Sequence, residues 1–260
     1  MSVRTESVVL VAGSTPVDLD IAQHLDHTGT QVVHVRDSEA DAVPEGVHSI
    51  VHPVRNFAQA ADLIAKVEGN HGPLHGLVTA TPPTSSASLV SLQAASWSEW
   101  RQRTIKRNVA LAKAATAAMI DREGGRLVVM SSTTAFFSAG AEQAATNAAM
   151  ISLSNAITLS TDAKKVASNC VIVGHGSDRG GAESAVETSA ALVSSLVAFL
   201  LGKASHHING RLLSCSGQSV GLYVLPLVIE STNAIVRFPD TPTGQELATA
   251  LDPLLEIGKV

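Results

Sequence analysis

The side chains that could do chemistry follow short apolar runs in this sequence. Gly13, Asp37 and Ser132 each come at or just after the end of such a run. A glycine turn can approach an anion, a carboxylate can bind hydroxyl groups, and a serine hydroxyl can hold a substrate oxygen. The chain has one tyrosine, Tyr223, which lies far along the sequence from these positions. No phenolic proton donor therefore accompanies the other polar groups.

The composition indicates a globular protein and argues against several functions. Of 260 residues, 45% are hydrophobic and 16% charged, with a net charge of −5 and no basic block. These values, with only 3% aromatic residues, make nucleic acid an unlikely partner. No apolar stretch approaches the roughly 18 residues of a membrane helix. Cys170 and Cys215 form no CxxC pair, which favours a reducing, cytoplasmic location. The neighbours His206 and His207 point apart, so we expect no metal site.

Strand and helix patterns alternate along most of the chain. The pattern predicts a strand–helix–strand unit at its start, and the alternation then continues without a second block. This predicts one doubly wound Rossmann-type α/β domain with a seven-stranded parallel sheet, formed by residues 1–218, and a C-terminal extension at 219–260. The expected strands are 7–12, 31–36, 48–53, 74–80, 125–131, 168–173 and 210–215. The expected helices are 18–27, 57–67, 96–120, 143–159 and 185–201.

Several blocks occur in a specific order. They are LVTAT after the fourth strand, GGRLVVMSS at the fifth, SNCVIVG at the sixth and HHINGRLLSCSGQ at the seventh. This series resembles the short-chain dehydrogenase/reductase family, particularly its 3-oxoacyl-reductase-like members. The resemblance covers about residues 7–218, and it implies an NAD(P)-dependent oxidoreductase fold.

The resemblance implies an active site of four groups. These are a serine that binds the substrate oxygen, a tyrosine that transfers the proton, a lysine four residues later, and an asparagine on the long central helix. The matching positions in this sequence are Ser132, Gln143, Asn147 and Thr104. A glutamine amide cannot serve as the proton donor, and an asparagine has no charge to lower a donor pKa. We therefore expect no intact catalytic set, and we interpret Ser132 as an inherited hydroxyl that closes a turn or as a surviving donor.

The dinucleotide-binding turn that the resemblance implies is also altered. Gly13 keeps its first glycine, but the next two glycine positions fall on Pro16 and Asp18. Proline removes an N–H donor, and a carboxylate opposes a phosphate. Asp37 stands where an acid would bind the cofactor ribose, or it is a plain turn residue. We expect this chain to bind no cofactor, with NAD(P) held by a partner subunit.

Two helices rich in small residues suggest that partner. Residues 104–120 and 143–159 carry alanines on more than one face, so each helix can pack closely on two sides. In the family these helices form a subunit interface; burial within the monomer is the alternative reading. A glycine-rich segment, residues 175–184, matches the family's substrate lid or is an ordinary loop. The extension contains an apolar run and a capping box at Thr243 and Glu246, and it needs a covering surface.

These features predict a non-catalytic subunit that assembles, as a heterotetramer, with an active homologous dehydrogenase. The resemblance makes a hydroxyacyl-CoA or 3-oxoacyl thioester the expected substrate of that complex, as in the heteromeric 2-(α-hydroxybenzyl)succinyl-CoA dehydrogenase of this family. A divergent oxidoreductase with a non-standard acid, for which Glu142 and Asp178 are the nearest candidates, is one alternative. A ligand-sensing pseudoenzyme is another.

Overall fold

A computed structural model describes residues 8–82, 88–122, 124–137, 140–162, 165–174, 190–216 and 219–223. The first compact unit of the chain comprises residues 1–223. The second unit, residues 224–260, lies outside the described residues, as do the capping box and most of the apolar run of the extension. None of the described helices is both long enough and apolar enough to cross a bilayer.

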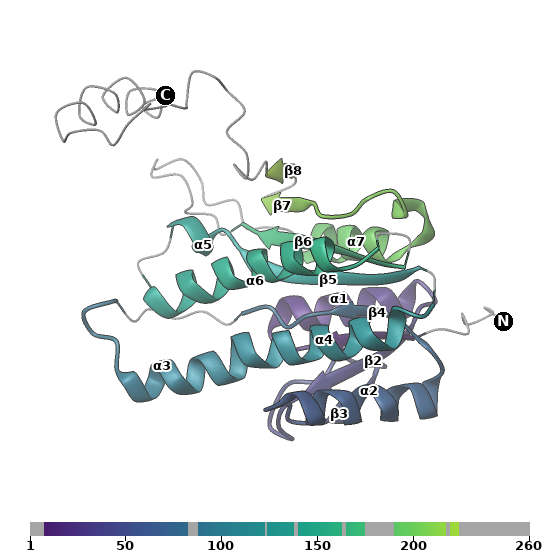
Figure 1. Cartoon of the computed structure of the whole chain (residues 1–260), viewed down its shortest axis with the longest axis horizontal. Helices are drawn as coiled ribbons and strands as arrows, with labels where there is room; N and C mark the ends of the chain where they lie inside the picture. The colour runs from purple at the N-terminus through teal and green to yellow at the C-terminus, as the bar shows by residue number, and fades with distance from the viewer. Residues whose placement is uncertain are drawn as a thin grey trace, which may run out of the picture. The chain divides into compact units, whose positions relative to one another are not determined.

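One eight-stranded sheet forms the centre of the first unit, with the order β3-β2-β1-β4-β5-β6-β7-β8 (Figure 1). The strands are β1 (Val8–Ala12), β2 (Gln31–Arg36), β3 (His48–Val51), β4 (Leu74–Val78), β5 (Gly125–Ser132), β6 (Val166–Val173), β7 (Leu212–Ser216) and β8 (Ser219–Tyr223). Strands β1 to β7 pair in parallel, which confirms the predicted doubly wound fold. The prediction of seven strands missed β8, which pairs antiparallel with β7. Residues 219–223 thus belong to the sheet and not to the extension.

Helices cover both faces of the sheet. They are α1 (Pro16–His27), α2 (Phe57–His71), α3 (Ala94–Arg101), α4 (Arg107–Met119), α5 (Thr134–Phe137), α6 (Ala141–Ser160) and α7 (Ala190–Leu201). Helices α2, α4 and α6 lie on one face, and α1 and α7 on the other (Figure 1). The helix predicted at 96–120 is divided by a π-helical turn, η1 (Gln102–Lys106), between α3 and α4. A short 3₁₀ turn, η2 (Lys203–Ser205), follows α7.

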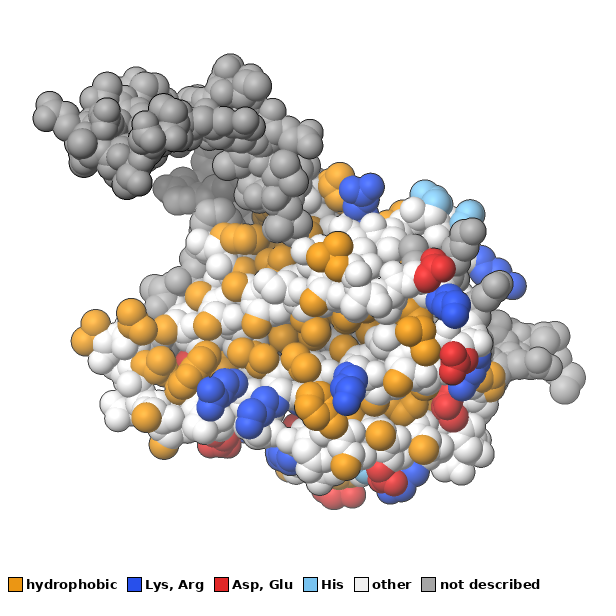
Figure 2. Space-filling model, in the orientation of Figure 1, with side chains coloured by type: hydrophobic (Ala, Val, Ile, Leu, Met, Phe, Trp, Pro, Cys, Tyr) orange, Lys and Arg blue, Asp and Glu red, His pale blue; other side chains and the backbone are white. Residues whose placement is uncertain are grey.

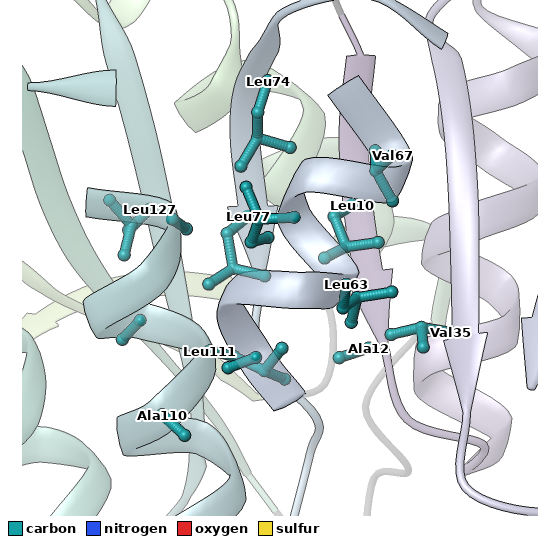
Figure 3. Packing of buried hydrophobic residues seen from close by; sticks show 14 of the residues in the cluster. Leu10, Ala12, Val35, Leu63, Val67, Leu74, Leu77, Ala110, Leu111 and Leu127 are labelled. Atoms are coloured by element: carbon teal, nitrogen blue, oxygen red, sulfur yellow. The ribbon is translucent and has the colours of Figure 1, made fainter. Parts of the chain in front are cut away.

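The two-residue period of β1 explains how one strand supplies both layers of the core. Leu10 and Ala12 pack beneath α2 and α4, where Figure 3 shows them beside Leu63 and Leu111. Val9 and Val11 point the other way and join α1 and α7 in a second apolar cluster. A strand that is buried on both faces needs an uninterrupted apolar run, and VVLVA is such a run.

Candidate ligand cleft and active-site positions

A cavity of about 520 Å³ opens at the carboxyl ends of the parallel strands. Its walls come from the turn after β1 (Gly13–Thr15), the end of β2 (Asp37), the segment after β4 (Ala80–Pro82), and the α3–η1–α4 helix. Ligands of open α/β sheets bind at this edge, at the point where the strand order reverses on either side of β1. The cavity therefore occupies the position where a ligand of this fold is expected.

The turn after β1 is closed from inside by a carboxylate. Asp18 is 0% exposed, and its Oδ2 accepts the backbone N–H of Thr15 at 3.0 Å and the Thr15 hydroxyl at 2.8 Å. Thr15 Oγ1 in turn accepts the N–H of Asp18, so Thr15 and Asp18 form a reciprocal capping box at the start of α1. The second oxygen of Asp18 accepts the N–H of Thr81 at 2.9 Å. One internal carboxylate thus uses backbone donors from both walls of the cavity.

Burial raises the pKa of Asp18 from 3.8 to about 6, and the hydrogen bonds from Thr81 and Thr15 offset only part of this effect. The carboxylate lies directly behind Gly13 and does not itself line the cavity. The sequence predicts a negative charge from Asp18 where the phosphates of a dinucleotide would lie. The structure places this carboxylate beneath the turn. Pro16, as the first residue of α1, has no N–H to offer on the outer side.

Two features of the structure show why a glycine is needed at position 13. Its φ is +104°, and a Cβ there would come within 2.3 Å of Asp18 Oδ2 and 2.9 Å of the Ala80 side chain.

The carbonyl oxygen of Gly13 accepts a hydrogen bond from Nε2 of His34, a residue of β2 that is 0% exposed. Since a carbonyl only accepts, His34 carries its proton on Nε2. Burial lowers the pKa of His34. The hydrogen bond from His34 to Gly13 attaches the turn to β2.

Asp37 is more than a turn residue, because it pairs with a buried arginine. Its Oδ1 lies 3.2 Å from Nε of Arg107, a residue of α4 that is 4% exposed. Arg55 approaches the other carboxylate oxygen at 3.8 Å. Burial lowers the pKa of Arg107, and the charge of Asp37 opposes this effect. This ion pair links α4 to the end of β2. It also engages the carboxylate of Asp37, the group that would bind the ribose of a cofactor in the alternative interpretation.

Asn108, the next residue, is a buried amide on the cavity wall. It is 1% exposed, and its Nδ2 donates to the Ala80 carbonyl at 3.2 Å and approaches Met150 Sδ at 3.4 Å. Both partners are acceptors, so the orientation of the amide is fixed by its surroundings. Its Oδ1 has no hydrogen-bond partner within the described part of the chain. The sequence analysis did not select Arg107 or Asn108, although two polar residues that open an alanine-rich helix were a visible signal.

Three of the four positions that the resemblance matches to catalytic groups form one hydrogen-bonded cluster. Ser132 Oγ accepts the N–H of Thr134, which agrees with its interpretation as a turn-closing hydroxyl. Asn147 Nδ2 donates to Thr134 Oγ1 at 3.0 Å and to the Gln143 carbonyl at 2.9 Å. Ser132, Gln143 and Asn147 are 2%, 5% and 0% exposed, and none of them lines the cavity. The uncharged pair at 143 and 147 is thus part of the packing between β5, α5 and α6.

Thr104, the fourth position, lies in the π-helical turn and does line the cavity. Its hydroxyl donates to the Trp100 carbonyl at 2.7 Å, which satisfies a backbone group of α3 next to the irregular turn. The indole Nε1 of Trp100 donates to Thr146 Oγ1 at 2.7 Å and so joins α3 to α6. Glu142, also on α6 and 5% exposed, completes that wall of the cavity.

The positions selected from sequence fall into three groups. Gly13, Asp37, Thr104 and the candidate acid Glu142 line the cavity, whereas Ser132, Gln143 and Asn147 lie in the buried cluster. Pro16 and Asp18 lie in the first turn of α1 and do not line the cavity. Asp178 and the lid segment, residues 175–184, lie outside the described residues. Within the described residues, no group of three or more His, Cys, Asp or Glu side chains could hold a metal ion.

Comparisons with known proteins agree with this geometry. The family model for short chain dehydrogenases matches residues 6–178. The fold is similar to the crystal structure of a short chain dehydrogenase from Mycobacterium avium, with a TM-score of 0.80, 15% identity, and coverage of 96% of this chain and 95% of that one. It is also similar to a single-substitution variant of actinorhodin polyketide ketoreductase with NADPH, with a TM-score of 0.72, 19% identity, and coverage of 84% and 98%. No curated protein matches the sequence significantly. The chain belongs to the short-chain dehydrogenase family.

Proposed function

We propose that this chain is a non-catalytic member of its family that assembles with an active homologous subunit and supports it. The observation that carries the proposal is the identity of residues 143 and 147. Gln143 and Asn147 stand where the family's proton donor and its lysine are expected, and neither amide titrates in the range that carbonyl–alcohol exchange requires. The buried bonds of Asn147 to Thr134 and to the Gln143 carbonyl give these residues a structural role instead.

The turn after β1 fits a nicotinamide dinucleotide poorly. A pyrophosphate needs free N–H groups at the start of a helix, and an anion gains from the helix dipole there. In this chain the N–H groups of Thr15 and Thr81 donate to Asp18, and Pro16 has none. An internal carboxylate thus already occupies the role of the anion. We therefore assign NAD(P) to the partner subunit and derive no reaction step in this chain.

One surface of the molecule supports a protein partner. We define the α4–α6 face by its exposed residues Lys106, Lys113 and Ala117 on η1 and α4, and Ala145, Ala148, Ser152, Ala156 and Leu159 on α6. Figure 2 shows hydrophobic side chains gathered over this part of the molecule, with Lys and Arg side chains along one side. The only charged residue in α6 is Glu142, which is buried. A surface helix without an exposed charge is typical of a helix that packs against another subunit.

The charges on this face favour a different subunit over a second copy. Its charged members are the cations Lys106 and Lys113. In an isologous pair of these helices, each copy would bring the same cations to a shared interface, where like charges repel. A homologous subunit with carboxylates at the corresponding positions would remove that repulsion. We also propose that the substrate of the complex is a thioester, and this part of the proposal is supported only by the resemblance to 3-oxoacyl reductases.

Affinity purification of the tagged full-length chain from its host tests the proposal. We expect a stoichiometric companion of the same family with an intact Tyr-x-x-x-Lys, and we expect NAD(P)-linked dehydrogenation of a hydroxyacyl-CoA only when both chains are present. A homo-oligomer without a companion would contradict the assembly. Turnover by the pure chain would contradict the non-catalytic role.

Two matched substitutions locate the interface. Ala148→Glu places a carboxylate at the centre of the α4–α6 face, where it should abolish recovery of the companion because an unpaired charge would be buried. Ala65→Glu makes the same change at an exposed alanine of α2, outside the defined face, and should leave recovery unchanged. Thermal unfolding of both isolated variants should match the parent, which excludes misfolding as the cause. Equal recovery from both variants would remove the face from the proposal.

A further inference from the structure

The cavity after β1 retains the volume of a small-molecule site although its loop donors are used internally. At about 520 Å³, it falls within the usual range for ligand pockets. Side chains have therefore not filled the space where a dinucleotide fits poorly. This cleft is separate from the α4–α6 face, so an inference about it goes beyond the proposed subunit role.

A buried acceptor on the cavity wall favours a ligand that brings a hydrogen-bond donor. Asn108 Oδ1 is without a partner among the described residues, and its amide is fixed by the bond from Nδ2 to Ala80. Leaving a buried carbonyl without a hydrogen bond is unfavourable, so the site favours a molecule with an N–H group. Thr104 cannot supply that donor, because its hydroxyl proton is given to Trp100.

The net charge of the cavity wall also favours a ligand that is not an anion. The described lining residues include four carboxylates, those of Asp37, Asp41, Glu99 and Glu142, and two guanidinium groups, those of Arg103 and Arg107. The carboxylates outnumber the guanidinium groups of the lining, and they still do when Arg55, which approaches Asp37 from outside the lining, is included. The wall as a whole is therefore negative. The negative charge of the wall would repel an anionic ligand and attract a cationic one. Trp100 adds an aromatic surface to the same wall.

We propose that the cleft between the β1 turn and the α3–η1–α4 helix binds an uncharged or cationic planar small molecule through its N–H groups, in place of a dinucleotide. Asn108 accepts one of these N–H groups, and the carboxylate-rich wall favours the positive charge. The site selects by charge and by donor capacity, the opposite of a pyrophosphate site.

Three ring compounds of nearly equal shape test this proposal on the full-length chain. Benzamidine is a cation with N–H donors, benzamide is neutral with N–H donors, and benzoate is an anion without them. Binding is followed through the indole N–H signals of the two tryptophans, Trp97 and Trp100, in a ¹⁵N-labelled sample. A Trp97→Phe variant assigns the Trp100 signal, which belongs to the cavity wall.

We expect benzamidine to bind at least about tenfold more tightly than benzoate, with benzamide between them. Asn108→Ala should weaken benzamide by about fivefold because one hydrogen bond is lost. The matched control Asn70→Ala changes an exposed amide on α2 and should leave binding unchanged. Tighter binding of benzoate or of ADP than of benzamidine, or no shift of the Trp100 signal at millimolar benzamidine, would overturn the proposal. The comparison of the three compounds on the unsubstituted chain stands even if the Asn108 variant does not fold.

Discussion

The carboxylate of Asp18 accepts the backbone N–H of Thr81 at 2.9 Å, across 63 residues of sequence. The same carboxylate caps the first turn of α1 through Thr15. A single buried charge thus connects the turn after β1 to the segment after β4, which are two walls of the cavity. Because Asp18 is buried, its ionisation affects the stability of the folded chain.

The stability of the chain should depend on pH through Asp18. Its pKa is raised from 3.8 to about 6 by burial, so the folded state binds the proton more tightly than the unfolded state. The stabilisation from this group is fully present below pH 3.8 and is lost as the pH rises through about 6, a change of about 3 kcal/mol. Asp18→Asn removes the titration. The free energy of unfolding of the parent, relative to this variant, should therefore fall by about that amount between about pH 4 and pH 7.

Urea unfolding followed by circular dichroism across this pH range checks the prediction. Asp20→Asn, at a partly exposed position on the same helix, controls for the loss of one negative charge. A parent–variant difference that stays constant with pH would mean that burial does not shift Asp18.

Gly13→Ala should be much more destabilising than Gly46→Ala. Both glycines have positive φ, +104° and +77°, so both substitutions carry the conformational cost of about 1–2 kcal/mol. A Cβ at Gly13 would also overlap Asp18 Oδ2 at 2.3 Å, whereas nothing lies within 4 Å of a Cβ at Gly46. We expect the difference between the two free energies of unfolding to exceed about 1 kcal/mol. Equal losses would show that the Asp18 carboxylate can move away without cost.

Asn147→Ala should lower the free energy of unfolding by about 2 kcal/mol, because Thr134 and the Gln143 carbonyl lose a buried donor. Asn155→Ala, at a half-buried position on the same helix, should change it by less than about 0.5 kcal/mol. Differential scanning calorimetry compares the two variants. A neutral Asn147 variant would argue against a structural role for this residue.

The Asp37–Arg107 pair should show strong coupling in a double-mutant cycle. Arg107→Met alone leaves Asp37 with only the more distant Arg55, and we expect a loss of about 3 kcal/mol. Asp37→Asn combined with Arg107→Met should recover at least about 1 kcal/mol of that loss. Arg55→Met, which removes a more exposed partner, should cost less than about 1 kcal/mol. Additive effects of the first two substitutions would contradict the coupling.

The sequence by itself determined the layout of the fold. Short apolar runs such as VVLVA, separated by helical periods, place β1 to β7 and their helices within a few residues of where the structure has them. This works because strand and helix periods are local properties of the chain. The strand β8 escaped prediction because its side chains are mostly exposed and so form no buried apolar run, although it follows β7 directly in an antiparallel hairpin.

Side-chain partners were decided only by the tertiary structure. Asp18 and Asp37 were both recognised as acids near a ligand cleft, but nothing local indicated that one would bond to Thr81 and the other to Arg107. Asn108 became a cavity residue because α4 brings it beside Ala80 and Met150. Residue types show which functional groups stand at a position, as they do at Gln143 and Asn147, whose side-chain amides do not titrate. Burial and long-range hydrogen bonds determine what the remaining polar groups do, because both depend on segments that meet only when the chain folds.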